Sequence, residues 1–456
     1  MNCLQREGLV ATALVAFLMS GCAGPSHTPA DAGPDGGDAG SSSDAGPSDA
    51  GTDGGTDGGS NPYADPMVRD FGLFAQTLAY DVPACPVGTD LLTTPMEDLA
   101  KLVAISPMGG LNPTGGHVFP VTHQYVTTTN TSSTNPSQAD SVDLKAPVRM
   151  KLLGIQSDHY VSGSFTRDDF FLSFFVCNRV AIYLGHVGAL SASFAAKVGS
   201  LTANCSTDSH SPGSSDTVCG GNPDEVWVDA GELIGQHHGD ETAMFDYRIV
   251  PLTLPDPIWN VNYYSVSTYD YYPDPLRSSY LSLVATFPME INHPLLDNPI
   301  PRTAQPREGM FIFEVSGKAK GNWVRANGTY YPDANNAALV QDASGDGSFQ
   351  DFSIGPSFNP AEAQGVYSFT PVATGTHNTD FALVGADGNT YCYDGFTALN
   401  HPPLWMTPQF GGSGTPYIIL VSMPTSTTLQ MEVRQAQSCG AAPYSLQQAH
   451  IVSFVK

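Results

Sequence analysis

The sequence predicts a mainly β protein: a small antiparallel β-barrel or sandwich with insertions, followed by a C-terminal all-β domain. Beyond residue 110 the chain is rich in Val, Thr, Tyr and Phe and is repeatedly interrupted by Gly and Pro, which is typical of short strands and turns. Two apolar runs of strand length, Phe171–Val176 and Val180–Leu184, predict neighbouring core strands. After residue 305 similar short runs predict further strands at Met310–Val315, Gly321–Arg325, Tyr367–Phe369, Phe381–Val384, Tyr417–Val421 and Leu429–Val433.

Length and charge limit the organisation and the partners. A chain of 456 residues exceeds the usual capacity of one core, so we expect a tail and two domains. Prolines near residues 300–308 favour a boundary there, which gives domains over 62–305 and 306–456. The net charge of −26, from 18 basic and 44 acidic residues, argues against nucleic acid as a partner and against electrostatic docking on anionic lipid.

The N-terminal residues 1–21 are predicted to be a lipoprotein signal peptide. Arg6 supplies a minimal positive region, and Leu9–Met19 is an apolar run too short to span a bilayer. Met19-Ser20-Gly21-Cys22 resembles a bacterial lipobox, so we expect Cys22 to be lipidated and to hold the protein in the bacterial cell envelope, in the periplasm or at the cell surface. This lipid would be its only attachment to the membrane. Ordinary secretion with cleavage near Ala23 is the alternative.

Residues 22–61 follow as an Asp-, Gly-, Ser- and Pro-rich segment that has nothing large and apolar to bury. Such a segment is expected to stay a disordered tether. The next residues carry the only helical spacing, at 67–78 and at 94–105.

The cysteines predict disulfides. Without Cys3 and the lipidated Cys22, an even number remains, and an exported chain folds in an oxidising compartment. These cysteines are Cys85, Cys177, Cys205, Cys219, Cys392 and Cys439. Proximity favours Cys205–Cys219 and then Cys392–Cys439, which would leave Cys85 with Cys177, but the sequence alone leaves about 15 connectivities open.

Three histidines are candidate functional residues because they lie in or next to predicted strands. His186 closely follows the second core run, at the expected end of that strand. The alternative to a functional role is a core histidine that is hydrogen-bonded to the backbone. His117 and His123 flank a proline upstream, and alternation places His123 and Tyr125 on one face of a strand.

A series of short motifs follows along residues 110–250: His123-Gln124-Tyr125-Val126, Val142-Asp143-Leu144-Lys145-Ala146-Pro147, Tyr183-Leu184-Gly185-His186-Val187, Val228-Asp229-Ala230-Gly231-Glu232-Leu233-Ile234-Gly235 and Phe245-Asp246-Tyr247. In this order, the motifs resemble those of the lysostaphin-type peptidoglycan metallo-endopeptidases. The resemblance covers about a third of the chain and implies a small antiparallel β-barrel or sandwich of endopeptidase type, with insertions.

The resemblance also implies where a zinc site would lie. His123 matches the first zinc ligand of the family and His186 matches a histidine that assists catalysis, so these two are the candidate metal ligands. Thr127 stands where an aspartate ligand is expected, and Met244 stands where a histidine is expected. Because a catalytic zinc needs three protein ligands, we assign no catalytic residues and expect no cofactor. The groove would be lined by His117, His123, Tyr125, His186 and Asp246.

A second metal motif lies in the C-terminal domain. Asp342, Ser344 and Asp346, with Gly347 following, open like a calcium-binding loop. Ser353 occupies the position of the usual bidentate glutamate, so a polar hairpin turn is the alternative.

These features predict a cell-envelope lipoprotein whose degenerate endopeptidase-like barrel binds a peptidoglycan peptide or an envelope protein without cleaving it. One alternative is a zinc metallohydrolase with an altered ligand set. Another is a structural envelope protein.

Overall fold

The computed structural model describes residues 82–456 except 87, 89, 112, 114–116, 129–140, 163–164, 202–204, 212–213, 222–224, 239–244, 252–265, 287–299, 329–334, 344, 356–363 and 397–415. The predicted signal peptide with Cys22, the tether and the helix over 67–78 lie outside the described residues. No helix in the described part of the chain combines the length and apolar character needed to cross a membrane.

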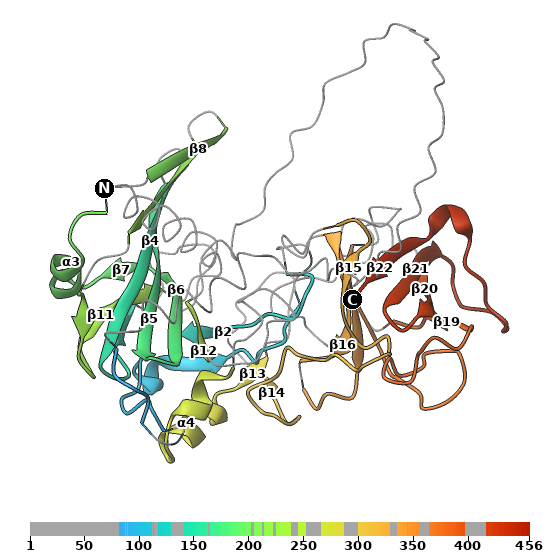
Figure 1. Ribbon diagram of the computed structural model, residues 1–456, viewed down its shortest axis with the longest axis horizontal. Coiled ribbons are helices and arrows are strands. Elements are labelled where there is room, and N and C mark those ends of the chain that lie inside the picture. Colours follow the sequence, from blue (N-terminus) through green and yellow to red (C-terminus); the bar gives the residue numbers. More distant parts are fainter. Residues whose placement is uncertain are drawn as a thin grey trace, which may run out of the picture.

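The described chain is mainly β and forms two bodies that lie side by side (Figure 1). The first body contains a nine-stranded sheet with the order β1-β2-β12-β6-β5-β4-β9-β8, in which β10 also pairs with β4. Its strands are β1 (Leu102–Ile105), β2 (Gln124–Thr128), β4 (Met150–Ser162), β5 (Phe165–Cys177), β6 (Val180–Val187), β8 (Cys205–Ser211), β9 (Ser214–Gly221), β10 (Trp227–Val228) and β12 (Asp246–Pro251).

A smaller sheet, with the order β3-β11-β7, packs against the first one. It consists of β3 (Ser141–Lys145), β7 (Ala189–Leu190) and β11 (Leu233–His238), and helix α3 (Ala192–Val198) follows β7. Leu144 of β3 and Ile234 of β11 share a core with Leu172 of β5 and Leu184 of β6. The first body is therefore a sandwich-like β unit with insertions.

The two central strands confirm the strands predicted from the apolar runs. β5 and β6 pair antiparallel through the turn at Asn178 and Arg179, and both faces are buried over residues 171–177 of β5 and along β6. Cys177, at the end of β5, is bonded to Cys85. The helix expected over 94–105 is wrong: only a short 3-10 turn, η3 (Leu99–Lys101), forms before β1 begins.

The remaining small elements of the first body pack against its hydrophobic core. They are η7 (Thr268–Tyr271), α4 (Leu276–Ser282) and the two-stranded pair β13 (Ala285–Thr286) and β14 (Ile300–Pro301). Four tyrosines gather there without exposure to solvent: Tyr247, Tyr269, Tyr272 and Tyr280.

These tyrosines surround a buried carboxyl group, Glu97. Tyr280 donates its hydroxyl hydrogen to Glu97 Oε2 at 3.1 Å, and its ring stacks between those of Tyr269 and Tyr272. Burial raises the pKa of Glu97 to about 8, against a smaller opposing effect of the Tyr280 hydrogen bond. The first body therefore contains a carboxyl group that favours its neutral form.

The second body is a nearly closed eight-stranded antiparallel barrel with the order β18-β17-β16-β15-β22-β21-β20-β19. Its strands are β15 (Gly321–Arg325), β16 (Ala337–Gln341), β17 (Gln350–Ile354), β18 (Gly365–Phe369), β19 (Thr390–Tyr393), β20 (Tyr417–Thr425), β21 (Thr428–Gln435) and β22 (Val452–Val455), and η10 (Gln448–His450) precedes the last strand. Aromatic rings fill the interior, and Phe369 of β18 meets Tyr393 of β19 with ring centroids 5.0 Å apart. The two end strands thus contact each other through their side chains.

Two further strands expected after residue 305 are not formed. The chain over 310–315 and over 381–384 is irregular. Positive φ angles at Gly309 and Gly317 bracket the first of these segments and interrupt an extended run. The predicted domain boundary at 305/306 lies between β14 and β15.

The two bodies share an apolar contact. Leu111 and Phe119 of the first body pack on Val324, Val340 and other side chains of the barrel that point away from its interior. Next to this contact two chain segments cross, where Met108 and Gly309 form a parallel bridge and the Met108 N–H donates to the Glu308 carbonyl at 2.8 Å. We call this place the interdomain crossing. It brings residues that are far apart in the sequence into backbone contact.

All six cysteines outside the N-terminal segment are paired. The bonds are Cys85–Cys177, Cys205–Cys219 and Cys392–Cys439. This confirms the three predicted disulfides and the pairing that proximity favoured.

Candidate functional site

His186 lies in a β-bulge at the end of β6. The pairing of β5 with β6 shifts between Phe170 and Leu172, so β6 carries one residue more than its partner at this point. His186 has φ 56°, an unusual value for a residue other than glycine. Such strain persists where the surroundings impose it, and it is often found at functional positions.

A carboxylate holds the His186 ring in place. His186 Nδ1 lies 2.6 Å from Asp169 Oδ2 on β5, and both side chains are buried. Because a carboxylate can only accept, Nδ1 donates this hydrogen bond. The edge of the ring also contacts Phe171, with centroids 5.0 Å apart. Asp169 therefore fixes the orientation of the imidazole.

Asp246 faces the other side of the same ring. His186 Nε2 lies 3.8 Å from Asp246 Oδ2. On β12, Asp246 is paired with Gly185 of β6, and a Cβ atom added to Gly185 would lie 2.5 Å from that same oxygen. Glycine at this position therefore makes room for the carboxylate, and His186 lies between two acidic groups.

The upstream candidates lie on the neighbouring strand. Tyr125 of β2 is paired with Asp246 across the sheet, so the two side chains lie on the same face. His123 Nε2 is 2.7 Å from the Tyr125 hydroxyl, and the His117 ring meets that of His123 edge-on with centroids 5.7 Å apart. His117 and Tyr125 are only partly buried, so this end of the group reaches the surface.

A cation also lies on this side of the sheet. Arg248, two residues after Asp246, donates from Nη1 to Thr122 Oγ1 at 3.0 Å, and its guanidinium lies 5.1 Å from the centre of the Tyr183 ring. Burial raises the pKa of Tyr183 to about 12, although the charge of Arg248 opposes this effect. The tyrosine therefore stays neutral and offers its ring to the cation.

The structure thus places the predicted groove residues on the adjacent strands β2, β12 and β6 and on the chain just before β2. It gives His123 and His186 different contacts: His123 contacts Tyr125 and His117, and His186 contacts Asp169 and Asp246. Asp169 and Arg248 were not predicted from the sequence. Thr127, at the position of the missing aspartate ligand, is buried in β2, and Met244 lies outside the described residues.

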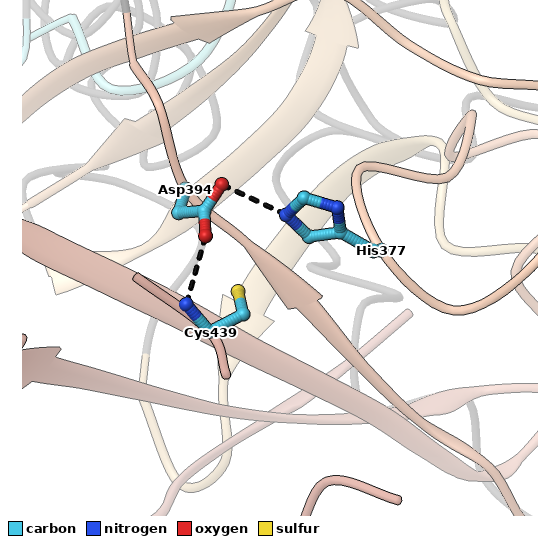
Figure 2. Close-up of side chains that lie close together, drawn as sticks. All are labelled: His377, Asp394 and Cys439. Atoms are coloured by element: carbon cyan, nitrogen blue, oxygen red, sulfur yellow. Dashed lines mark hydrogen bonds and ion pairs between the residues drawn. The ribbon is translucent and has the colours of Figure 1, made fainter. Parts of the chain in front are cut away.

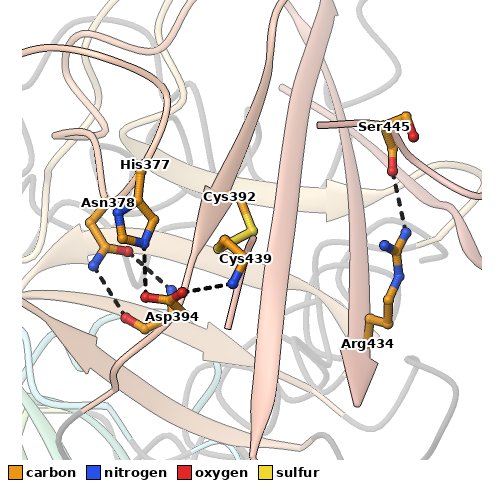
Figure 3. Close-up of a disulfide and its surroundings, with 7 residues drawn as sticks. All are labelled: His377, Asn378, Cys392, Asp394, Arg434, Cys439 and Ser445. Carbon is orange, nitrogen blue, oxygen red and sulfur yellow. Dashed lines mark hydrogen bonds and ion pairs between the residues drawn. A yellow bond between two sulfur atoms is a disulfide. The ribbon is translucent and has the colours of Figure 1, made fainter. Parts of the chain in front are cut away.

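Metal-ligand geometry is found elsewhere. In the part of the chain that the structure describes, one group of three His, Cys, Asp or Glu residues has its ligand atoms within 4.8 Å of one another, and it consists of His377, Asp394 and Cys439 (Figure 2). The Cys439 sulfur is bonded to Cys392 (Figure 3), so it is not a thiolate ligand in this state. His123 and His186 belong to no such group among the described residues.

The calcium-like motif forms the turn between β16 and β17. Ser344 lies outside the described residues, and Asp346 Oδ1 accepts from the Ser348 N–H at 2.9 Å. Arg302 is buried against this turn, where its guanidinium donates to the Ala343 carbonyl and attracts Asp342. A positive charge from the chain itself therefore already lies beside the predicted ligands.

In chemical terms, the group around His186 offers two carboxylates, two hydroxyl-bearing rings and a guanidinium on one side of a sheet. Such a set can bind a ligand that carries both hydrogen-bond donors and an acidic group. Comparison of the chain with protein-family models, with curated proteins and with solved structures finds no match.

Proposed function

We propose that the protein is a cell-envelope lipoprotein whose first β body binds a peptidoglycan peptide or an envelope protein without cleaving it. The observation that carries this proposal is His186, held at a positive φ between Asp169 and Asp246, with Tyr125 and Arg248 on the adjoining strands. We call these residues and His123 the His186 cluster.

The charge pattern of the His186 cluster supports a peptide ligand. Asp246 can pair with an amino group, and Arg248 can pair with a carboxylate, and the stem peptides of peptidoglycan carry both kinds of group. Recognition of this kind needs fixed side chains, which the Asp169–His186 and His123–Tyr125 hydrogen bonds provide. The lipobox-like segment at Cys22 and the three disulfides support placement in the envelope.

The second candidate function is a metallohydrolase with an altered ligand set. The 3.8 Å between His186 Nε2 and Asp246 Oδ2 favours it, because one cation can contact two ligand atoms at this separation. Asp169 would then act as the carboxylate that orients a metal-bound histidine. Zinc has four ligands in most protein sites, and the two named atoms supply half of them.

Removal of one hydroxyl group tests the binding proposal. Tyr125→Phe takes away the partner of His123, so the affinity for purified peptidoglycan should fall about two- to tenfold, as expected for one hydrogen bond. Co-sedimentation of the full chain with sacculi over a range of protein concentrations measures this change. Tyr160→Phe is the matched control, since Tyr160 is partly buried, as Tyr125 is, but lies on β4 outside the His186 cluster.

Three results separate the alternatives. No sedimentation of the wild-type protein above its level in a sacculus-free sample would favour a protein partner or a structural role. Release of new amino groups from sacculi, together with one zinc per chain, would establish the metallohydrolase. Equal loss in Tyr125→Phe and Tyr160→Phe would remove the His186 cluster as the binding site.

Lipid attachment is tested by fractionation. Because the thiol of Cys22 would carry the lipid, Cys22→Ser should move the protein from the membrane fraction to the soluble fraction of a bacterial host. Metabolic labelling with a fatty acid, followed by immunoprecipitation, gives a second readout. Label on the Cys22→Ser protein would contradict the lipobox.

A further inference from the structure

The Cys392–Cys439 disulfide joins two parts of the barrel's outer surface. Cys392 lies in β19 and is fully buried, whereas Cys439 lies on the partly exposed segment that follows β21. Around the bond, Ile418 and Leu420 of β20 form a small apolar cluster with side chains of that segment. The bond thus links a buried residue to a partly exposed one.

A histidine–aspartate pair lies directly beside this bond. His377 Nε2 is 2.8 Å from Asp394 Oδ1, and the other oxygen of Asp394 accepts from the Cys439 N–H at 2.8 Å (Figures 2 and 3). Asp394 therefore contacts both the histidine and the outer cysteine.

The backbone holds the pair at the disulfide. His377 forms a parallel bridge with Cys392, and Asn378 and Asp394 exchange two hydrogen bonds, at 3.0 and 3.2 Å. Asn378 has φ 50°, which is unusual for a residue other than glycine. The two side chains are thus positioned by the same strand that carries Cys392.

We propose that His377, Asp394, Cys392 and Cys439 form a redox-dependent site for a soft divalent cation such as Zn²⁺. The cation would bind only after the Cys392–Cys439 bond is reduced. Ligand atoms of His377, Asp394 and Cys439 already lie within 4.8 Å of one another, and Cys392 is the bonded neighbour of Cys439. Two thiolates, one imidazole and one carboxylate make a tetrahedral zinc set. In the oxidised protein the sulfurs are bonded to each other and do not bind zinc as thiolates.

The chemistry balances with a dithiol as reductant. The dithiol gives two electrons and two protons to the disulfide, becomes a disulfide itself and leaves two thiols on the protein. Zinc binding then releases the two thiol protons, so its affinity rises with pH. The bound metal would replace the lost covalent link between β19 and the segment after β21.

The other disulfides lack these neighbours in the described part of the chain. Cys205 and Cys219 join β8 and β9, and β9 lies next to β4. His159 of β4 is exposed, and its Nδ1 lies 2.6 Å from Oδ1 of the exposed Asp168 on β5. That pair belongs to no group of three ligand atoms within 4.8 Å. His159 therefore supplies a control for His377, since the two histidine side chains are equally exposed and each contacts an aspartate.

The experiment is a titration of the full chain with Zn²⁺, with and without a reductant, in competition with a chromophoric chelator. The reduced protein should bind one zinc per chain tightly, and the oxidised protein should bind at least tenfold more weakly. His377→Ala removes a direct ligand, so it should weaken binding to the reduced protein by at least the roughly ten- to hundredfold that loss of an outer-shell partner costs, whereas His159→Ala should leave binding unchanged. Equal binding by reduced His377→Ala and wild type would overturn the proposal.

A variant avoids reduction of the other two disulfides. Cys392→Ser leaves Cys439 as a thiol beside His377 and Asp394, so this variant should bind Co²⁺ without a reductant and show the charge-transfer absorption of a thiolate ligand. The second change Asp394→Asn should weaken that binding at least tenfold. Absence of the thiolate absorption in Cys392→Ser, while the Cys439 thiol reacts with an alkylating agent, would also overturn it.

Discussion

A single methyl group added at the interdomain crossing should destabilise the protein strongly. Gly109 and Gly309 both have positive φ, 92° and 82°, and an added Cβ would overlap the Met310 carbonyl oxygen in one case and the Met108 carbonyl oxygen in the other. Backbone atoms cannot turn away as a flexible side chain can. We therefore expect Gly109→Ala and Gly309→Ala each to lower the free energy of unfolding by about 3 kcal/mol or more.

Gly375→Ala is the matched control for this prediction. Gly375 also has a positive φ, 89°, but an added Cβ would meet nothing within 4 Å. Only the backbone strain remains there, so we expect a loss of about 1–2 kcal/mol. Denaturant unfolding of the three variants measures the difference, and a loss at Gly309 no larger than that at Gly375 would contradict the close crossing.

The second large effect concerns pH and the buried carboxyl group of Glu97. Its pKa is raised in the folded state, from an ordinary 4.5 to about 8, so the unfolded chain loses this proton at lower pH than the folded one. The stabilisation is complete below pH 4.5 and is lost as the pH rises to about 8. Across this window Glu97 should lower the free energy of unfolding by about 1.4 kcal/mol per pH unit.

Glu97→Gln isolates this contribution. The amide cannot ionise, so the variant should be less sensitive to pH than the wild type between these two values, and the difference should grow toward pH 8. Glu225→Gln is the control, because the Glu225 side chain is exposed and its pKa is lowered, chiefly by hydrogen bonds from Lys151 and Trp227. Denaturant unfolding at several pH values measures the free energy of unfolding of each protein. The same pH dependence of this free energy in wild type and Glu97→Gln would refute the prediction.

The β class and the central hairpin could be predicted because β6 and the second half of β5, from Phe171, are buried on both faces and therefore form continuous apolar runs in the sequence. The barrel strands β15, β18, β20 and β21 show similar runs. The strands β16 and β17 were not predicted. Their sequences, AALVQ and QDFSI, are short and contain small or polar residues that are buried only after the strands pair. The irregular segments over 310–315 and 381–384 look like strands in sequence, but one of them lies at the interdomain crossing.

The candidate site could be predicted only in part. His186, His123 and Tyr125 stood out because strand alternation and the order of motifs mark them. Asp169 did not, although an acidic residue just before the apolar run of β5 was a usable signal. His377 and Asp394 carry no motif at all. Their proximity arises from the parallel bridge between His377 and Cys392, a contact that local sequence patterns do not encode.

The position of β22 has a consequence for the order of folding. This strand pairs with β15 on one side and β21 on the other, and Val324 lies opposite Val455. The meander of β15 to β18 and the meander of β19 to β21 therefore cannot join into one sheet until a strand later than both has inserted between them. A chain with so many distant pairings pays the entropy of closing a long loop before the barrel gains its core. Its folding should be slow compared with that of a helical protein of equal size, and during that delay the free edges of β15 and β21 would be open to pairing with other chains.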